Sequence, residues 1–145
     1  MNYFDSSALI KRFAAEPGSA LVDRLVETSP AGTSKVSYAE VYSGLTRMKR
    51  ERRLGKAAYD MACRQFEMEW QAYAQILLAD EILSLARDLI RRYPLRGFDA
   101  IHLASAVGLG RMLGERSRFI AANQKLLKAA EAEGLEALNV EARQM

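Results

Sequence analysis

Short apolar segments alternate along this chain with segments whose apolar residues recur every three or four positions. This alternation restricts the fold more than any other feature, because it predicts strands separated by helices. The expected strands are residues 3–4, 33–36, 76–79, 119–121 and 136–140, the last at a sheet edge. The expected helices are residues 6–15, 20–28, 37–50, 80–92, 98–109 and 124–133, with one more that begins after Gly55. The alternation predicts an α/β fold in which helices cover both faces of a parallel sheet.

Size and cysteine content limit the class of protein. The chain has 145 residues, 50% of them hydrophobic, and its composition does not shift along the sequence, so we expect a single domain spanning residues 1–145. Cys63 is the only cysteine, which excludes an intrachain disulfide and favours a reducing cytoplasm. The N-terminal segment lacks the pattern of a signal peptide, and no apolar run is long enough to cross a bilayer. We therefore expect no association with a membrane.

Three acidic residues, Asp5, Glu40 and Asp99, each lie where a predicted strand or a short break gives way to a helix. In a parallel sheet the C-terminal ends of the strands and the helices that follow them border one crevice, so these carboxylates can converge. Carboxylates held together repel one another and raise one another's pKa values. A hard divalent cation relieves this repulsion and prefers oxygen ligands, so the pattern predicts a Mg²⁺ or Mn²⁺ site.

The basic residues are unevenly placed, although the net charge is only +3. One group contains Arg47, Lys49, Arg50, Arg52, Arg53 and Lys56. A second group, Arg91, Arg92 and Arg96, lies shortly before Asp99. A solvated helix face explains most charge runs, but the nearness of these residues in sequence to the carboxylates favours a polyanionic substrate.

Four segments of the chain also carry a family resemblance. They read, in order, FDSSALIKRF, SYAEVYSGL, RGFDAIHLASA and FIAANQKLLKAA. In this order and spacing they resemble the successive motifs of PIN-domain proteins, specifically the VapC-type toxins of bacterial toxin–antitoxin pairs, over nearly the whole chain. The resemblance implies a metal-dependent ribonuclease built as a three-layer α/β/α sandwich. It also implies inhibition by a cognate antitoxin protein and assembly as a homodimer.

The resemblance assigns roles to individual residues. Asp5, Glu40 and Asp99 match the first three acidic positions of the family, which hold or orient the metal. Ser6 matches a small hydroxyl residue that accompanies the first aspartate. Asn123 stands where the family pattern usually has a fourth aspartate. An asparagine oxygen can still bind a hard cation, but the site loses one negative charge, so a second metal ion should bind more weakly.

The activity that follows is hydrolysis of an RNA phosphodiester bond by water at a metal site. Asp5, Glu40 and Asp99 would hold the metal, and Asn123 would support it. The RNA backbone would be positioned by Ser6, Arg47, Arg50 and Arg96.

Two other functions stay open at this point. A PIN-like module could bind RNA or a protein partner without cutting, as the departure at Asn123 would allow. A phosphoacceptor receiver domain is the other alternative, because Asp80 follows the third predicted strand. Receivers have an acidic pair after the first strand, however, and this chain has Asp5 followed by serines.

Helix capping competes with metal binding as the role of several polar residues. Asp5 and Asn123 each precede a predicted helix, where either side chain could act as the N-cap. Glu40 lies three residues after Ser37, the spacing of a capping box. We assign Asp80 to capping alone. Both roles stay open for the other three.

The remaining singled-out residues have simpler interpretations. Asp99 has no local partner that would explain it as a cap, so functional weight rests first on this residue and on Asp5. His102, the only histidine, is interpreted as a hydrogen-bonded packing residue rather than a general base. A stripe at helical spacing is interpreted as core or dimer surface rather than as a platform for base stacking; it comprises Tyr59, Ala62, Phe66, Trp70 and Tyr73.

Overall fold

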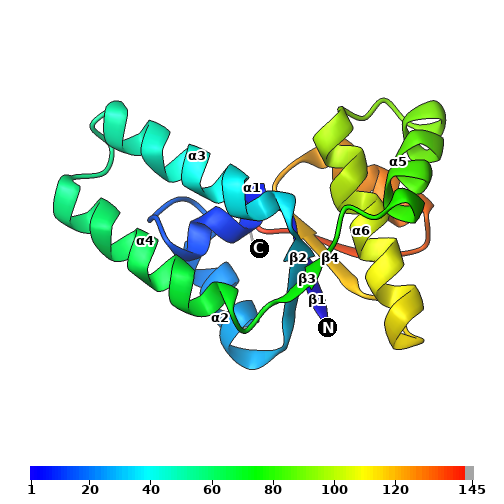
Figure 1. Ribbon diagram of the computed structural model, residues 1–145, viewed down its shortest axis with the longest axis horizontal. Coiled ribbons are helices and arrows are strands. Elements are labelled where there is room, and N and C mark those ends of the chain that lie inside the picture. Colours follow the sequence, from blue (N-terminus) through cyan, green and yellow to red (C-terminus); the bar gives the residue numbers. More distant parts are fainter. Residues whose placement is uncertain (143–145) are drawn as a thin grey trace.

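The structure, a computed structural model, describes residues 1–142 (Figure 1). Its sheet has five parallel strands in the order β3-β2-β1-β4-β5. The strands are β1 (Asn2–Phe4), β2 (Ala31–Ser34), β3 (Ala74–Ile76), β4 (Arg118–Ala121) and β5 (Glu136–Asn139). The predicted parallel sheet is confirmed, and β5 lies at an edge as expected.

Helices form the two outer layers of an α/β/α sandwich (Figure 1). One layer contains α1 (Ser6–Leu9), the 3₁₀ helix η1 (Ile10–Arg12), α2 (Ser19–Thr28), α3 (Val36–Arg50) and α4 (Lys56–Trp70). The other contains α5 (Asp80–Arg92), α6 (Gly97–Leu113) and α7 (Gln124–Ala132). Successive strand residues face opposite layers. Tyr3 and Phe119 therefore pack in the core beneath α5–α7, whereas Phe4 and Ile120 pack beneath α1–α4.

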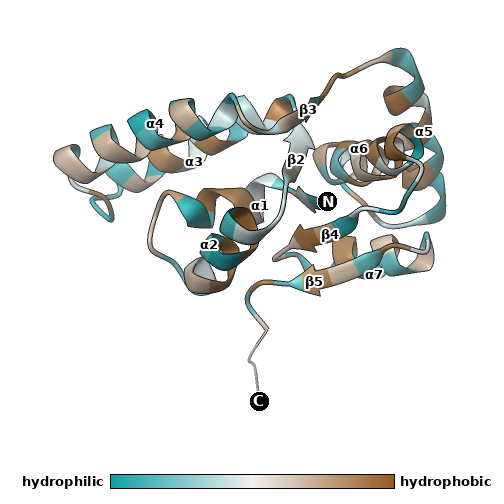
Figure 2. Cartoon of the chain, turned by 90° about the horizontal axis from the view of Figure 1, so that it is seen from below, coloured by the Kyte–Doolittle hydropathy of each residue, from teal (hydrophilic) through white to brown (hydrophobic). Residues whose placement is uncertain are grey.

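Helix α6 is apolar around most of its surface because it lies between α5 and the sheet (Figure 2). It carries Asp99 in its first turn and the buried His102 one turn later. Despite this apolar helix, nothing in residues 1–142 combines the length and hydropathy that a membrane-crossing helix requires.

Helices α3 and α4 run side by side away from the sheet (Figure 1). The predicted aromatic stripe of α4 faces inward here: Phe66 is fully buried and Trp70 and Tyr73 nearly so. Phe66 meets Phe13 edge to face, with ring centroids 5.1 Å apart. The interpretation of this stripe as core is confirmed.

The first predicted helix, residues 6–15, is wrong in its length. The α-helix ends at Leu9 and continues only as the tighter η1 to Arg12. Within η1, Lys11 is almost fully buried and contacts Glu141 with an Nζ to Oε1 distance of 2.7 Å. Local periodicity does not report such a contact with the far end of the sequence.

Two predicted strands are displaced. Strand β2 is Ala31–Ser34 rather than 33–36, and β3 is Ala74–Ile76 rather than 76–79. Gly32 lies within β2, where a Cβ atom would come within 2.8 Å of Leu109 on α6. This glycine permits close packing between helix and sheet. Helix α6 also begins before and ends after the predicted 98–109.

Candidate functional site

The site lies between β1 and β4, where the order in which strands are added to the sheet reverses. From β1 the chain proceeds toward β2 and β3 on one side, whereas β4 and β5 lie on the other. Asp5 follows β1 directly, and its backbone N–H donates to the Ile120 carbonyl of β4 at 3.1 Å. Asn123 follows β4 and precedes α7. Ligands of open α/β sheets bind in the crevice at such a switch point.

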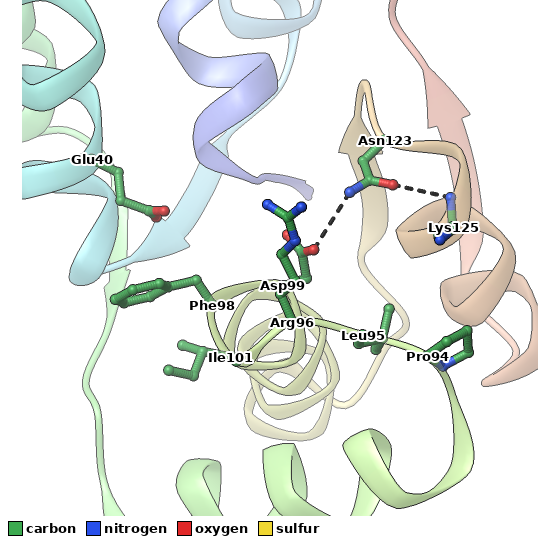
Figure 3. Close-up of a pocket in the computed structure, with 10 residues that line it drawn as sticks. Glu40, Pro94, Leu95, Arg96, Phe98, Asp99, Ile101, Asn123 and Lys125 are labelled. Carbon is green, nitrogen blue, oxygen red and sulfur yellow. Dashed lines mark hydrogen bonds between the residues drawn. The ribbon is translucent and has the colours of Figure 1, made fainter.

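An open hollow of about 930 Å³ occupies this edge of the sheet (Figure 3). Its polar lining comes from three helices, with Glu40 on α3, Asp99 on α6 and Lys125 on α7. Arg96, Phe98 and Asn123 also line it. The hollow is large enough for a nucleotide-sized ligand.

Asp5 is 3% exposed and is not one of the residues that line this hollow. Its Oδ1 accepts a hydrogen bond from the Ala8 backbone N–H at 2.9 Å, so it caps α1. The Ser7 hydroxyl lies 2.8 and 2.9 Å from its two oxygens. Burial raises the pKa of Asp5 and the charge of Asp99 raises it further, whereas His102 and the hydrogen bonds from Ser7 and Ala8 oppose these effects. Capping and participation in a charged site therefore occur together at this residue.

Asp99 is half-buried at the start of α6 and points into the hollow (Figure 3). Burial raises its pKa, and the charge of Glu40 acts in the same direction. His102 and Arg96 oppose this shift. The Asn123 side-chain amide donates to Asp99 Oδ2 over 3.4 Å, a long hydrogen bond. Asp99 is thus repelled by Glu40 and only weakly held by the Asn123 amide.

Glu40 is held by a buried chain of hydrogen bonds. Tyr3 Oη lies 2.7 Å from His102 Nδ1, and His102 Nε2 lies 2.8 Å from Glu40 Oε1. The Ser34 backbone N–H also donates to the Tyr3 oxygen. Because a carboxylate only accepts hydrogen bonds, His102 Nε2 is the donor in the hydrogen bond to Glu40. The interpretation of His102 as a hydrogen-bonded packing residue is confirmed.

The capping-box alternative for Glu40 is wrong. Lys35 occupies the N-cap position of α3, which places Ser37 inside the helix. The Ser37 hydroxyl shares a hydrogen bond of 2.6 Å with Thr33 instead of serving a capping box. Glu40 is free to face the hollow because the helix end does not use it.

Asn123 and Asp80 differ in the way they begin their helices. Asn123 Oδ1 accepts from the backbone N–H groups of Lys125 and Leu126, at 3.0 and 3.3 Å, so its capping role is confirmed. Asp80 was assigned to capping, but Ala79 is the N-cap of α5 and Asp80 is the first helical residue. Its charge there is still favourable to the helix dipole. Asp80 is also exposed and follows the edge strand β3, two strands from β1, so it has no place in a receiver-type acidic site.

The donors of this site fit a hard divalent cation in their chemistry. Asp5, Glu40 and Asp99 offer carboxylate oxygens, and a cation would offset the repulsion and burial that raise the pKa values of the two aspartates. Across residues 1–142, however, no three His, Cys, Asp or Glu side chains form a ready-made metal cluster. Binding would therefore require these carboxylates to draw closer together.

The predicted RNA-contacting residues do not lie together. Arg96 lines the hollow, and Ser6 begins α1 beside Asp5. Arg47 and Arg50 lie in the last turn of α3, at the end remote from Glu40, and Arg50 borders a separate hollow on that helix.

Three residues of the site were missed in the sequence. Ser7, not Ser6, hydrogen-bonds to Asp5. Lys125 and Phe98 line the hollow beside the carboxylates. For Ser7 the signal was its position two residues after a helix-capping aspartate; nothing local distinguishes Lys125 from other surface lysines.

The chain is similar to known proteins in sequence. A family model described as PIN domain matches residues 3–132. Ribonuclease VapC45 of Mycobacterium tuberculosis (strain CDC 1551 / Oshkosh) is 36% identical over 109 residues, which cover 74% of this chain and 76% of that protein. Ribonuclease VapC46 of Mycobacterium tuberculosis (strain ATCC 25618 / H37Rv) is 32% identical over 136 residues, 92% of each chain.

Solved structures share the fold. A chain in a toxin-antitoxin complex from Klebsiella pneumoniae superposes with a TM-score of 0.67 and 22% identity, covering 97% of this chain and 98% of that one. The family model and the relatives together span the strands and helices that carry all four site residues, Asp5, Glu40, Asp99 and Asn123. The chain therefore belongs to the PIN-domain family and, within it, to the VapC-type proteins.

Proposed function

We propose that this protein is a metal-dependent endoribonuclease that hydrolyses RNA phosphodiester bonds. The observation that carries the proposal is the placement of Asp99 and Glu40 in one hollow, with the buried Asp5 near Asp99, and Arg96 and Lys125 in the same lining. Carboxylates next to cationic side chains suit a site that handles a phosphate and a metal together. The names of the two relatives, both ribonucleases, support the same activity.

Each side chain has a defined part in this proposal. Asp5, Glu40 and Asp99 would hold Mg²⁺ or Mn²⁺, which when bound supplies activation of water and shielding of the phosphate charge. Arg96 and Lys125 bind the RNA backbone next to the scissile bond. Arg47 and Arg50 remain predicted contacts farther along the RNA, on α3, and Ser6 remains one beside Asp5.

The buried chain from Tyr3 through His102 fixes Glu40. Because His102 Nε2 donates to Glu40 Oε1, that carboxylate keeps one orientation and presents its remaining electron pairs to the hollow. Partners that orient a metal ligand in this way commonly affect metal affinity by 10- to 100-fold. His102 is thus a positioning residue and does not transfer protons in this scheme.

The test is cleavage of a mixed RNA panel by the wild type and by Asp99→Asn, with Mg²⁺, Mn²⁺ or a chelator. Asp80→Asn is the matched control, because Asp80 is an exposed aspartate in the first turn of a neighbouring helix. We expect metal-dependent cleavage by the wild type and the control, and none by Asp99→Asn. Equal cleavage by all three proteins would refute the assignment of the site.

A second candidate function is RNA or protein binding without cleavage. It is favoured by Asn123, whose amide donates to Asp99 where the family pattern usually has a carboxylate. Asn123→Asp distinguishes the two. Cleavage that is absent in the wild type and present in the variant would support the binding function, whereas robust cleavage by the wild type excludes it.

The proposal includes two protein partners. An antitoxin is supported by the similarity to a chain of the Klebsiella pneumoniae toxin-antitoxin complex. A homodimer is supported by exposed apolar side chains, namely Leu77 and Leu78, which follow the edge strand β3, and Met112 on α6. Leu77 and Met112 border the same hollow beside β3. Light scattering of the purified chain, compared with Leu77→Glu, tests the second. A monomeric wild type would contradict it.

A further inference from the structure

Phe98 is the exception among the five phenylalanines of this chain. The other four, Phe4, Phe13, Phe66 and Phe119, are buried in the two cores. Phe98 is 58% exposed and lines the candidate active site. A single exposed phenylalanine needs no explanation by itself. Its position next to Asp99 does, because the other four phenylalanines are all buried in the cores.

The aromatic side chain and the cationic side chains lie in different parts of the hollow (Figure 3). The Phe98 ring lies on the Glu40 side of Asp99, beside Ile101, while Asn123 and Lys125 lie on the opposite side. Arg96 lies between them, close to Asp99. Phe98 and Ile101 therefore border the carboxylates at one end and Arg96 borders them in the middle, whereas Lys125 lies at the other end together with Pro94 and Leu95.

This arrangement matches the chemistry of one nucleotide unit in a single strand. The phosphate is anionic and suits Arg96 and Lys125, whereas the base is a flat π-surface that suits an exposed aromatic ring. Single-stranded nucleic acid is commonly bound by such a combination of cationic groups and stacking side chains. We propose that an unpaired base of the RNA stacks on Phe98, next to the bond that is cleaved.

The inference rests on the proposed ribonuclease function and adds a specificity determinant to it. A base held in a duplex is stacked on its neighbours and cannot turn onto Phe98, so the site selects single-stranded RNA. Because every base has a π-face, stacking at this point tolerates several bases and does not by itself define a cleavage sequence.

The experiment pairs a change in the protein with a change in the RNA. A single-stranded substrate that the wild type cuts is prepared with one abasic position, moved stepwise across the cleaved bond. Wild type, Phe98→Ala and Phe98→Trp are compared on the whole series, both for cleavage and, in chelator, for binding by fluorescence anisotropy. Thermal melts control for folding, which an exposed side chain should leave unaffected.

We expect one abasic position next to the cleaved bond to weaken binding and cleavage by the wild type by about 5- to 150-fold. Phe98→Ala should show a loss of that order on intact RNA and no further loss at that position, while Phe98→Trp follows the wild type. Additive losses in Phe98→Ala, or wild-type behaviour of this variant, would overturn the inference and leave the ribonuclease function standing. If the wild type binds RNA and cuts none, the proposed function fails. The abasic position is then moved along a single-stranded RNA that the wild type binds, and binding alone decides the role of Phe98.

Discussion

The two carboxylates that face the hollow are held in different ways. Glu40 is attached to the core by the chain of hydrogen bonds through His102 and Tyr3, with distances of 2.8 and 2.7 Å. Within residues 1–142, the one hydrogen bond to the Asp99 side chain is the 3.4 Å contact with Asn123, and burial raises the pKa of Asp99. One carboxylate is oriented in advance, while the other is a poorly compensated charge. In such a site the protein orients Glu40 in advance, whereas the charge of Asp99 is compensated when a cation binds.

The largest expected effect comes from removing either charge. Asp99→Asn and Glu40→Gln should each reduce cleavage by about 100-fold or more, since each removes a charged group at the reacting centre. Their stabilities should differ in chelator. Glu40→Gln keeps an oxygen that accepts from His102 and should melt like the wild type, whereas Asp99→Asn removes a destabilising charge and should melt at a higher temperature.

Cleavage assays and thermal melts on the same preparations check this pair, with Asp80→Asn as the exposed control. A lower melting temperature for Asp99→Asn would show that the comparison between the two carboxylates is mistaken.

Loss of the hydrogen bonds that connect Tyr3, His102 and Glu40 is expected to have the next largest effect. His102→Ala leaves a cavity and removes the partners of the Tyr3 hydroxyl and of Glu40, so we expect the free energy of unfolding to fall by about 2–4 kcal/mol. Tyr3→Phe removes only one hydroxyl, which should cost about 1 kcal/mol. Urea denaturation measures both.

The His102→Ala variant also tests whether the hydrogen bonds from Tyr3 through His102 to Glu40 affect metal binding. Metal affinity should fall in His102→Ala by about 10-fold or more. An unchanged metal affinity in a folded His102→Ala protein would argue that Glu40 needs no anchor.

The pH dependence of stability should follow from the raised pKa values of Asp5 and Asp99. A carboxyl whose pKa is higher in the folded protein than in the unfolded chain holds its proton better when folded. Its stabilising contribution is therefore complete below the ordinary aspartate pKa of about 4 and is lost as the pH rises through the raised value.

In chelator, the two aspartates should thus lower the stability near neutral pH, and a divalent cation should restore it. Melting temperatures of the wild type from pH 4 to pH 8, with and without Mg²⁺, measure this difference. The expected gain with Mg²⁺ grows as the pH rises; a gain that is the same at all pH values would contradict the assignment of these groups to the cation.

The smallest expected effect concerns Asn123. In Asn123→Asp, one carboxylate oxygen can still cap α7, while the other faces Asp99 in place of the amide N–H. We expect a small loss of stability in chelator, on the order of 1 kcal/mol, and tighter binding of Mn²⁺. Calorimetric titration with Mn²⁺ measures the affinity. The control is Asn139→Asp, because Asn139 ends β5 and does not line the hollow.

If Asn123→Asp binds Mn²⁺ no better than the wild type, the fourth position has no part in the metal site. If the affinity of this variant for Mn²⁺ rises, the amide at position 123 is what weakens metal binding in the wild type.

The sequence by itself determined the succession of strands and helices along the chain and the parallel arrangement of the sheet. It also placed Asp5, Glu40 and Asp99 near one edge of that sheet. These features depend on local periodicity and on the general geometry of α/β sheets, both of which can be read along the chain. The PIN-type motifs added the family, which the comparisons confirm.

Only the tertiary structure decided how those residues are held. The anchoring of Glu40 joins Tyr3 on β1, His102 on α6 and Glu40 on α3, residues separated by 99 and 62 positions. The short α1, the displaced β2 and the exposed Phe98 likewise result from packing between distant segments. Such contacts arise from the free energy of the whole core, so no local pattern in the sequence reports them.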